Sequence, residues 1–339
     1  MPSHDVLIIG SGLGASAIAR RLVDAGADVA MITGVGCARF KHLDGGVIDR
    51  SLLDAAFGET GAAPLQQSDK ATVFRRNLLE TWAVAKSGVV HHDGFNEGKC
   101  LPNDRGEYTV VDESGAQSIQ ARLVLLTEGA NPKIGMAARL RPDFAPEDMV
   151  HFGRAFVAGA RLNRAIYGDW RTSWNMPAWY SAVPVEGGAL VSASTRIENV
   201  MRSSRDGRDT LRDLLDSPFA EELDVFDFTG EIGMELVPLQ PTLPVETVGF
   251  DNLGITADAN GMIDPRAENR YDQVLRAALI YAEALSTAGA FQVDWDRIAI
   301  SLGDMFSNQR TPYHDSSDTG FIEEGAGERR GLIGRLFKR

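Results

Sequence analysis

The chain has 339 residues, 44% of them hydrophobic and 24% charged, so it can bury a large core in one or two domains and is not disordered as a whole. Its net charge of −13 repels phosphate backbones and argues against nucleic-acid binding. The two cysteines, Cys37 and Cys100, cannot build a disulfide framework or a four-thiolate zinc or iron–sulfur site, and no apolar run is long enough to span a membrane. We therefore expect a soluble cytoplasmic protein without a metal site.

The first forty residues predict a strand, a helix and a second strand. Residues 6–9 are a continuous apolar run, typical of a parallel strand that is covered on both faces. The turn that follows fits G-x-G-x-x-A at Gly10, Gly12 and Ala15. The first glycine permits a tight turn, the second lets a pyrophosphate approach the backbone, and the small third residue lets the helix touch the strand. With the second strand, at 29–33, this unit predicts a dinucleotide-binding site.

The end of the second strand departs from the usual dinucleotide site. Thr33 stands where an acidic residue normally holds the ribose hydroxyls, and a threonine can form a hydrogen bond there but carries no charge. A glycine-rich turn alone is also compatible with an α/β protein that binds no nucleotide. The later segments therefore decide between these alternatives.

Four further segments follow in chain order. They are a loop with a double glycine at 41–48, a strand end leading into a helix at 73–82, an apolar strand with a Thr-x-Gly turn at 121–131, and an apolar strand closing on an aspartate at 252–265, before a helix over about 271–288. This ordered set resembles the FAD-dependent oxidoreductases of the FixC, electron-transfer-flavoprotein:quinone oxidoreductase and geranylgeranyl reductase group. The resemblance covers residues 1–150 and 230–290.

The resemblance implies an α/β fold with a Rossmann-like FAD-binding domain of the glutathione-reductase type. We expect this domain to be discontinuous, over residues 1–150 and 235–305. A small α+β substrate domain at 151–234 would be inserted in it, and residues 306–339 would form a flexible tail. The segments 179–185 and 189–194 flank Glu186-Gly187-Gly188 and predict a β-hairpin in the substrate domain.

The resemblance also implies positions for the cofactor. In that group a double glycine lies beside the isoalloxazine ring, an arginine supports the phosphate and ribose side, and an aspartate binds the ribityl chain. Gly45-Gly46, Arg75 and Asp258 match these features, and residues 261–263 match the backbone that meets the pyrimidine edge. The full expected set is Gly10, Gly12, Gly14, Ala15, Thr33, Gly45, Gly46, Arg75, Gly129, Asp258, Gly261, Met262 and Ile263.

Three residues depart from the pattern of the group. Ala257 and Arg270 stand where glycines are usual, and Thr33 replaces the acidic residue. The departures leave three alternatives open: a retuned flavin pocket, reversible FAD binding, or a protein that kept the fold and lost the cofactor.

Two groups of side chains are candidates for the substrate side. Trp170, Trp174, Trp179 and Tyr180 would line an apolar or planar substrate pocket, or else form the core of a small sheet. His42, beside the double glycine, is the candidate for proton transfer near the flavin.

The sequence thus predicts an FAD-dependent oxidoreductase that either reduces a carbon–carbon double bond or oxidises a metabolite and relays electrons to a ferredoxin or electron-transfer flavoprotein. Two cysteines exclude the version with its own iron–sulfur cluster. The alternatives are a non-catalytic flavoprotein-like subunit of a complex and an NAD(P)-binding dehydrogenase that uses only the first motif. The end of the chain, Arg329–Arg339, is basic with apolar residues at helical spacing, and is either a peripheral membrane or partner contact or a solvated tail.

Overall fold

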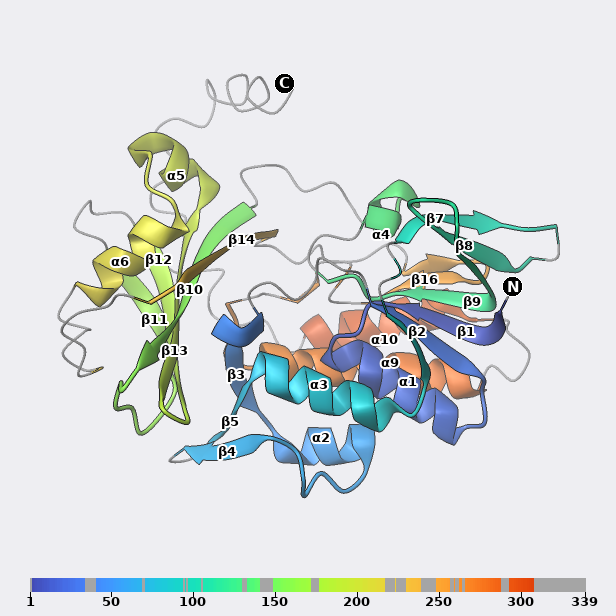
Figure 1. Cartoon of the computed structure of the whole chain (residues 1–339), viewed down its shortest axis with the longest axis horizontal. Helices are drawn as coiled ribbons and strands as arrows, with labels where there is room; N and C mark the ends of the chain where they lie inside the picture. Colours follow the sequence, from blue (N-terminus) through green and yellow to red (C-terminus); the bar gives the residue numbers. More distant parts are fainter. Residues whose placement is uncertain are drawn as a thin grey trace.

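The structure is a computed structural model of the chain. It describes residues 2–33, 41–68, 71–93, 95, 97–104, 106–129, 133–140, 149–171, 177–216, 223, 230–238, 248–256, 259, 262, 263, 266–287 and 293–307. These residues form three sheets and the helices that cover them (Figure 1).

The largest sheet has eight strands and a parallel centre. Its main path is β15 (Gly249–Phe250), β16 (Leu253–Ile255), β9 (Ser118–Leu126), β1 (Ser3–Ile9), β2 (Val29–Thr33) and β6 (Val90–Asp93), and the hairpin of β7 (Glu97–Pro102) and β8 (Tyr108–Asp112) pairs with β9. From β16 to β6 the path is parallel. This arrangement needs both faces covered, which explains the continuous apolar runs.

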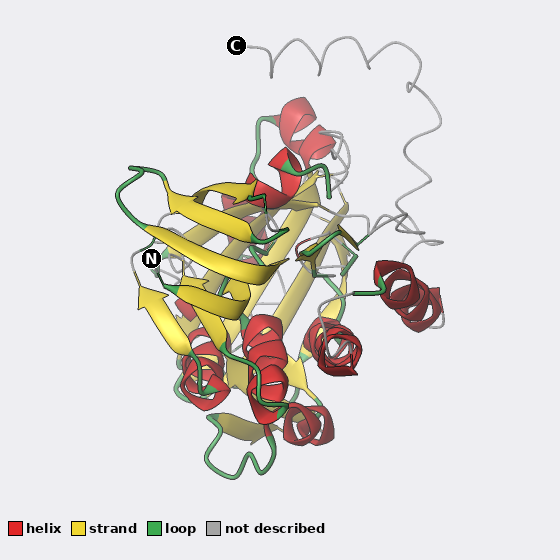
Figure 2. Ribbon diagram, turned by 90° about the vertical axis from the view of Figure 1, so that its right-hand side faces the viewer, coloured by secondary structure: helices red, strands yellow, loops and turns green. Residues whose placement is uncertain are grey.

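Helices cover one face of this sheet and a hairpin covers the other (Figure 2). The helical layer is α1 (Leu13–Asp24), α2 (Arg50–Phe57), α3 (Arg76–Ser87), α9 (Arg270–Thr287) and α10 (Trp295–Ser307). On the other face, Leu7 and Ile9 pack with side chains of β8 and of the short helix α4 (Lys133–Ala137). Successive residues of β1 thus point into different cores, as the alternation of a strand requires.

The second large sheet is antiparallel. Its order is β11 (Ile166–Arg171), β12 (Pro177–Val185), β13 (Gly188–Arg196), β10 (Met149–Ala158) and β14 (Ile232–Pro238). The predicted hairpin is confirmed as β12 and β13, and its turn has Gly187 at φ 81° and Gly188 at φ 159°. Helix α6 (Gly207–Leu215) packs on one face, and α5 (Ile197–Ser203) follows β13.

A three-stranded sheet joins the two large ones. It consists of β3 (Gly45–Ile48), β5 (Ala71–Arg75) and β4 (Leu65–Ser68), and the 3-10 turn η1 (Lys41–Leu43) precedes it. Val73 of β5 packs with Val183, Val185 and Leu190 of the antiparallel sheet. The double-glycine segment therefore lies where the Rossmann-like sheet and the antiparallel sheet meet.

The α/β Rossmann-like fold with an antiparallel sheet domain is confirmed, as are the predicted strands and helices of the glycine-rich unit. The sequence analysis did not predict α10 or the hairpin β7–β8. No helix among the described residues is long and apolar enough to cross a membrane.

Candidate functional site

The glycine-rich turn opens α1 toward a pocket. Gly10 has φ +115°, and a Cβ atom there would lie 2.2 Å from the carbonyl oxygen of Thr127, so only glycine fits. Gly12 is the N-cap of α1, and the nearest atom to a Cβ built on it is Glu80 Oε1 at 3.8 Å. No side chain caps this helix. The first N–H groups of α1 are therefore available to an anion.

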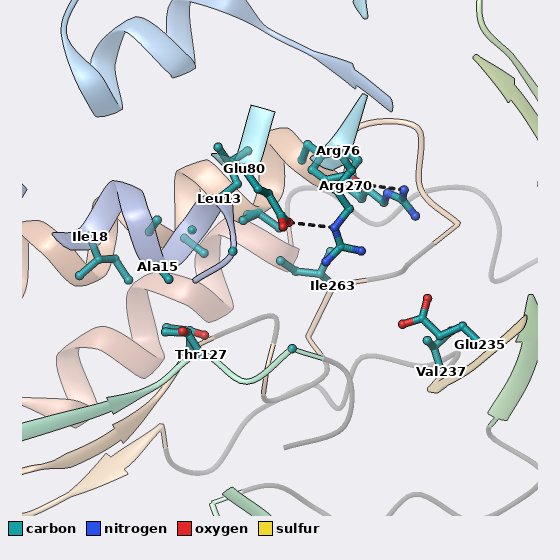
Figure 3. A pocket seen from close by; sticks show the side chains of 18 of the residues that line it. Leu13, Ala15, Ile18, Arg76, Glu80, Thr127, Glu235, Val237, Ile263 and Arg270 are labelled. Atoms are coloured by element: carbon teal, nitrogen blue, oxygen red, sulfur yellow. Dashed lines mark hydrogen bonds and ion pairs between the residues drawn. The ribbon is translucent and has the colours of Figure 1, made fainter. Parts of the chain in front are cut away.

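The pocket lies between the helical layer and the antiparallel sheet (Figure 3). Arg76, Glu80 and Arg270 lie on one side of it, and Glu235 and Val237 lie across from them. Its lining residues are Gly12, Leu13, Gly14, Ala15, Ile18, Arg76, Glu80, Thr127, Gly129, Arg154, Glu235, Val237, Thr256, Ile263, Arg270, Tyr271, Val274, Ala277 and Ala278. The cavity volume is about 120 Å³.

A buried carboxylate lies next to the open helix end. Glu80 pairs with Arg76, at 2.8 Å between Oε1 and Nε, and with Lys41, at 2.5 Å between Oε2 and Nζ. Burial opposes ionisation of Glu80, but the charges of Arg76 and Lys41 outweigh it and lower the pKa of the carboxyl. Arg76 is shared with Asp44, so the charges are counted over the whole group: four cations, Lys41, Arg76, Arg154 and Arg270, pair with three carboxylates, Glu80, Asp44 and Glu235. The remaining positive charge suits a phosphate.

The second buried carboxylate, Asp44, joins three arginines. Its Oδ1 accepts from Arg270 Nη2 at 2.5 Å, and its Oδ2 accepts from Arg76 Nη1 at 3.0 Å and Arg154 Nη1 at 3.2 Å. The hydroxyl of Tyr271 also donates to Oδ2, at 3.3 Å. Burial opposes ionisation of Asp44, but the three guanidinium groups hold its pKa well below the usual range. We call Asp44, Arg76, Arg154, Arg270 and Tyr271 the Asp44 cluster.

The Asp44 cluster extends to the antiparallel sheet through Arg154. This side chain is 5% exposed and also pairs with Glu235 of β14, at 2.6 Å between Nη1 and Oε2. Glu235 is 34% exposed, so the ion pair connects the buried cluster with the solvent side of the pocket.

Several expected cofactor residues come together here. Gly12, Gly14, Ala15, Gly129 and Ile263 line the pocket. Gly14 also has a packing role, because a Cβ atom on it would lie 2.9 Å from Val274 Cγ1.

The double glycine is covered by the chain itself. A Cβ atom on Gly45 would lie 2.3 Å from the Phe74 carbonyl oxygen and 2.5 Å from Leu190 Cδ1. A Cβ atom on Gly46 would lie 2.6 Å from the ring of Tyr271. Both glycines are thus needed for close packing of β5, β13 and α9, a reason that the sequence analysis missed.

Three expected site residues, Arg75, His42 and Met262, do not line this pocket. Arg75 donates to the Glu186 carbonyl at 2.9 Å and stacks over Phe156, because it is the extended residue before α3. His42 is 46% exposed and pairs with Glu231 at 3.2 Å. Met262 is buried in the core under α1 and α9 and does not line the pocket.

The other expected residues lie apart from the pocket or outside the described part of the chain. Trp179 is buried, with Arg266 above its ring, and Tyr180 packs against Gly168 and the core beneath α6, so neither side chain lines this pocket. The hydroxyl oxygen of Thr33 lies 3.4 Å from Nδ1 of His91. Trp170 is placed only as a position in β11. Trp174, Ala257, Asp258 and Gly261 lie outside the described residues.

The sequence analysis missed Arg76, Glu80 and Arg154. Helical spacing could have found the first two, because Arg76, Leu79, Glu80 and Ala83 share one face of α3, and Leu79 and Ala83 are buried. Arg154 gave no local signal, since its partner Asp44 lies 110 residues away.

The pocket fits one half of FAD better than the other. The open end of α1 and the remaining positive charge of the ion-paired group around Glu80 and Asp44 fit the pyrophosphate of the ADP half. At the other end, the side chains of Arg270 and Tyr271 lie against the double glycine, where the resemblance expects the isoalloxazine. The cavity is also smaller than the roughly 300–1,000 Å³ of ordinary small-molecule sites. In this arrangement, the flavin half can enter only if the Arg270 side chain moves away from Asp44 and Gly45.

A comparison with known proteins gives a sequence relative. No family model matches the chain. The chain is 23% identical over 285 residues to digeranylgeranylglycerophospholipid reductase 1 of Methanopyrus kandleri, covering 77% of this chain and 74% of that protein.

Solved structures show the same fold. The geranylgeranyl bacteriochlorophyll reductase-like protein of Thermoplasma acidophilum matches with a TM-score of 0.65 and 16% identity, over 91% of this chain and 84% of that one. A myxobacterial chondrochloren halogenase, described as a variant of FAD-dependent halogenases, matches with a TM-score of 0.67 and 14% identity, over 99% and 89%. The chain is thus similar in sequence to a digeranylgeranylglycerophospholipid reductase, and it shares its fold with a geranylgeranyl bacteriochlorophyll reductase-like protein and an FAD-dependent halogenase.

Proposed function

We propose that the protein uses FAD to reduce carbon–carbon double bonds in an apolar, isoprenoid-like lipid. The observation that carries the nucleotide part is the uncapped start of α1 at Gly12, which opens into the pocket beside Arg76 and Lys41. The relative from Methanopyrus kandleri supports the lipid part, because its name describes a reductase of a prenylated glycerophospholipid.

The pocket lining supports a substrate with apolar and charged parts. Val237 and Ile263 offer apolar surface, while Glu235 of the edge strand β14 presents charge and is paired with the buried Arg154. A lipid whose apolar chain approaches the pocket and whose polar head stays near the sheet edge suits this division. In enzymes of this kind the flavin supplies the electrons, and the protein supplies binding and orientation. We further propose that a ferredoxin or an electron-transfer flavoprotein delivers these electrons.

The test is a reduction assay on the full-length protein. The protein is mixed with FAD, dithionite and a glycerophospholipid with geranylgeranyl chains, in detergent micelles under anaerobic conditions. We expect products that have gained hydrogen at the double bonds, detected by mass spectrometry, and no products from the Gly12→Val variant.

A protein that binds FAD and leaves the prenyl chains unchanged would contradict the proposed substrate. A protein that binds neither FAD nor ADP would contradict the proposed enzyme and favour the non-catalytic subunit.

A further inference from the structure

The flavin end of the pocket is occupied by an arginine of this chain. Arg270 Nη2 donates to Asp44 Oδ1 at 2.5 Å, to the Gly45 carbonyl at 3.2 Å, and lies 3.0 Å from the Tyr271 hydroxyl. Its side chain is 17% exposed. In the group that this chain resembles, a glycine stands at position 270, and a glycine leaves this space open.

Tyr271 completes the cover. Its ring lies against Gly46 and packs edge-on against Phe74, at 4.7 Å between ring centroids. Arg270 and Tyr271 are the first residues of α9, so the helix that should face the flavin presents side chains at the double glycine.

Removal of Arg270 would not leave Asp44 without a counter-ion. Arg76 and Arg154 both contact the other carboxylate oxygen of Asp44, at 3.0 and 3.2 Å. The buried charge therefore stays compensated when Arg270 is absent. The glycine turn and the Lys41–Glu80 pair belong to other elements than Arg270, which is the first residue of α9.

We propose that Arg270, held by Asp44, determines the ligand affinity of this pocket by competing with the isoalloxazine ring. The pocket binds ADP-bearing ligands through their ADP half at the start of α1. The flavin ring adds affinity only when the Arg270 side chain leaves Asp44, so FAD is a dissociable ligand. This inference rests on the proposed function in that it takes the glycine turn as the nucleotide site.

Calorimetric titration of the full-length protein with FAD, ADP and riboflavin tests the proposal. In the wild-type protein we expect the dissociation constants of FAD and ADP to agree within about threefold, and riboflavin not to bind. In Arg270→Ala we expect FAD to bind about tenfold more tightly and ADP to bind as before. Arg276→Ala is the matched control, since Arg276 is an exposed arginine of the same helix, and should change neither affinity.

The ratio of the two affinities decides the outcome. Wild-type protein that binds FAD about a hundredfold more tightly than ADP would overturn the proposal, even if Arg270→Ala does not fold. An unchanged ratio in a folded Arg270→Ala variant would also overturn it. Loss of both FAD and ADP binding in the wild-type protein would instead overturn the proposed function, so the two failures are distinguishable.

Discussion

At the scale of single residues, the two glycines of the first turn have different roles. Gly10 is required by the backbone, because its φ of +115° and its contact with Thr127 leave no room for a side chain. Gly12 has an ordinary extended backbone, with φ −71° and ψ 177°, and faces the pocket. The first glycine is therefore required by the fold, whereas the second lies open to the pocket.

This difference predicts that a substitution of Gly10 affects stability, whereas a substitution of Gly12 affects ligand binding. Gly10→Ala should destabilise the protein by about 3–5 kcal/mol, because the methyl group would overlap the Thr127 carbonyl. Gly12→Ala should change stability by less than about 0.5 kcal/mol and still weaken ADP binding. Urea unfolding and ADP titration of both variants measure the two effects. Equal stability of the two variants would contradict the assignment.

Thr33 allows a test of where the ribose of the nucleotide binds, because the dinucleotide motif expects the ribose at this strand end. Thr33→Glu should tighten ADP and FAD equally, by about 1–2 kcal/mol, because a carboxylate can accept two ribose hydrogen bonds where the threonine makes one. The nearby His91, 3.4 Å from the Thr33 hydroxyl, would face the new carboxylate. Titration of both nucleotides against Thr33→Glu, with Thr33→Val as the control, measures the gain. Unchanged affinity would show that the ribose lies elsewhere.

At the scale of elements, Asp44 connects four parts of the fold. It precedes β3, and its partners come from the start of α3, from β10 and from the start of α9. Two of these elements belong to the helix layer and one to the antiparallel sheet. The Asp44 cluster therefore ties the two large sheets together through charge as well as packing.

Asp44→Asn should lower the free energy of unfolding by about 3–5 kcal/mol at neutral pH, because it leaves buried guanidinium groups without their shared anion. Asp24→Asn is the control, because Asp24 is an exposed residue of α1 that is ion-paired with Arg20. It should lower the free energy of unfolding by less than about 1 kcal/mol. Urea unfolding of the two variants measures the difference. A loss below about 1 kcal/mol for Asp44→Asn would contradict the role of the cluster.

The same carboxylate predicts a pH dependence. The pKa of Asp44 is lowered in the folded protein from its ordinary 3.8, so as the pH falls below this value the unfolded state takes up the proton first. Protonation of Asp44 should then lower the wild-type free energy of unfolding by up to about 1.4 kcal/mol per pH unit. The gap in free energy of unfolding between the wild-type protein and Asp44→Asn should narrow accordingly. Unfolding curves at neutral pH and at about pH 3 give the comparison. A constant gap would contradict a lowered pKa of Asp44 in the folded protein.

The sequence predicted elements better than it predicted the site. Continuous apolar runs and helical periodicity depend on neighbours in the chain, so β1, α1, β2 and α9 were found near their observed bounds. The Asp44–Arg270 contact joins residues 226 positions apart, and no local pattern encodes it. The sequence analysis noted Arg270 only because a glycine is usual at that position, and it did not single out the partner of Arg270, Asp44. Arg75 was expected from the resemblance alone, and no local pattern shows that the side chain of its neighbour Arg76 reaches the pocket.

At the scale of the whole molecule, charge is unevenly distributed along the sequence. The net charge is −13, yet residues 328–339 carry five basic side chains against one acidic one. These residues lie outside the described part of the chain.

Deletion of residues 328–339 should leave FAD binding unchanged and weaken association with anionic vesicles. Each basic side chain near such a surface contributes roughly 1 kcal/mol, and salt screens this attraction. Vesicle co-sedimentation of the full and shortened chains, at low and high salt, measures the effect. Equal sedimentation of the two forms at low salt would contradict a membrane contact.

The proposed dependence on FAD is tested most directly by the visible absorption of flavin bound to the protein. Full-length protein is equilibrated with FAD and separated by rapid gel filtration at an FAD concentration kept constant in the buffer. We expect the protein peak to carry additional flavin absorbance, and the peak of Gly12→Val, which fills the ligand side of the turn, to carry none. A wild-type peak without flavin absorbance, at any FAD concentration that the column tolerates, would contradict the claim.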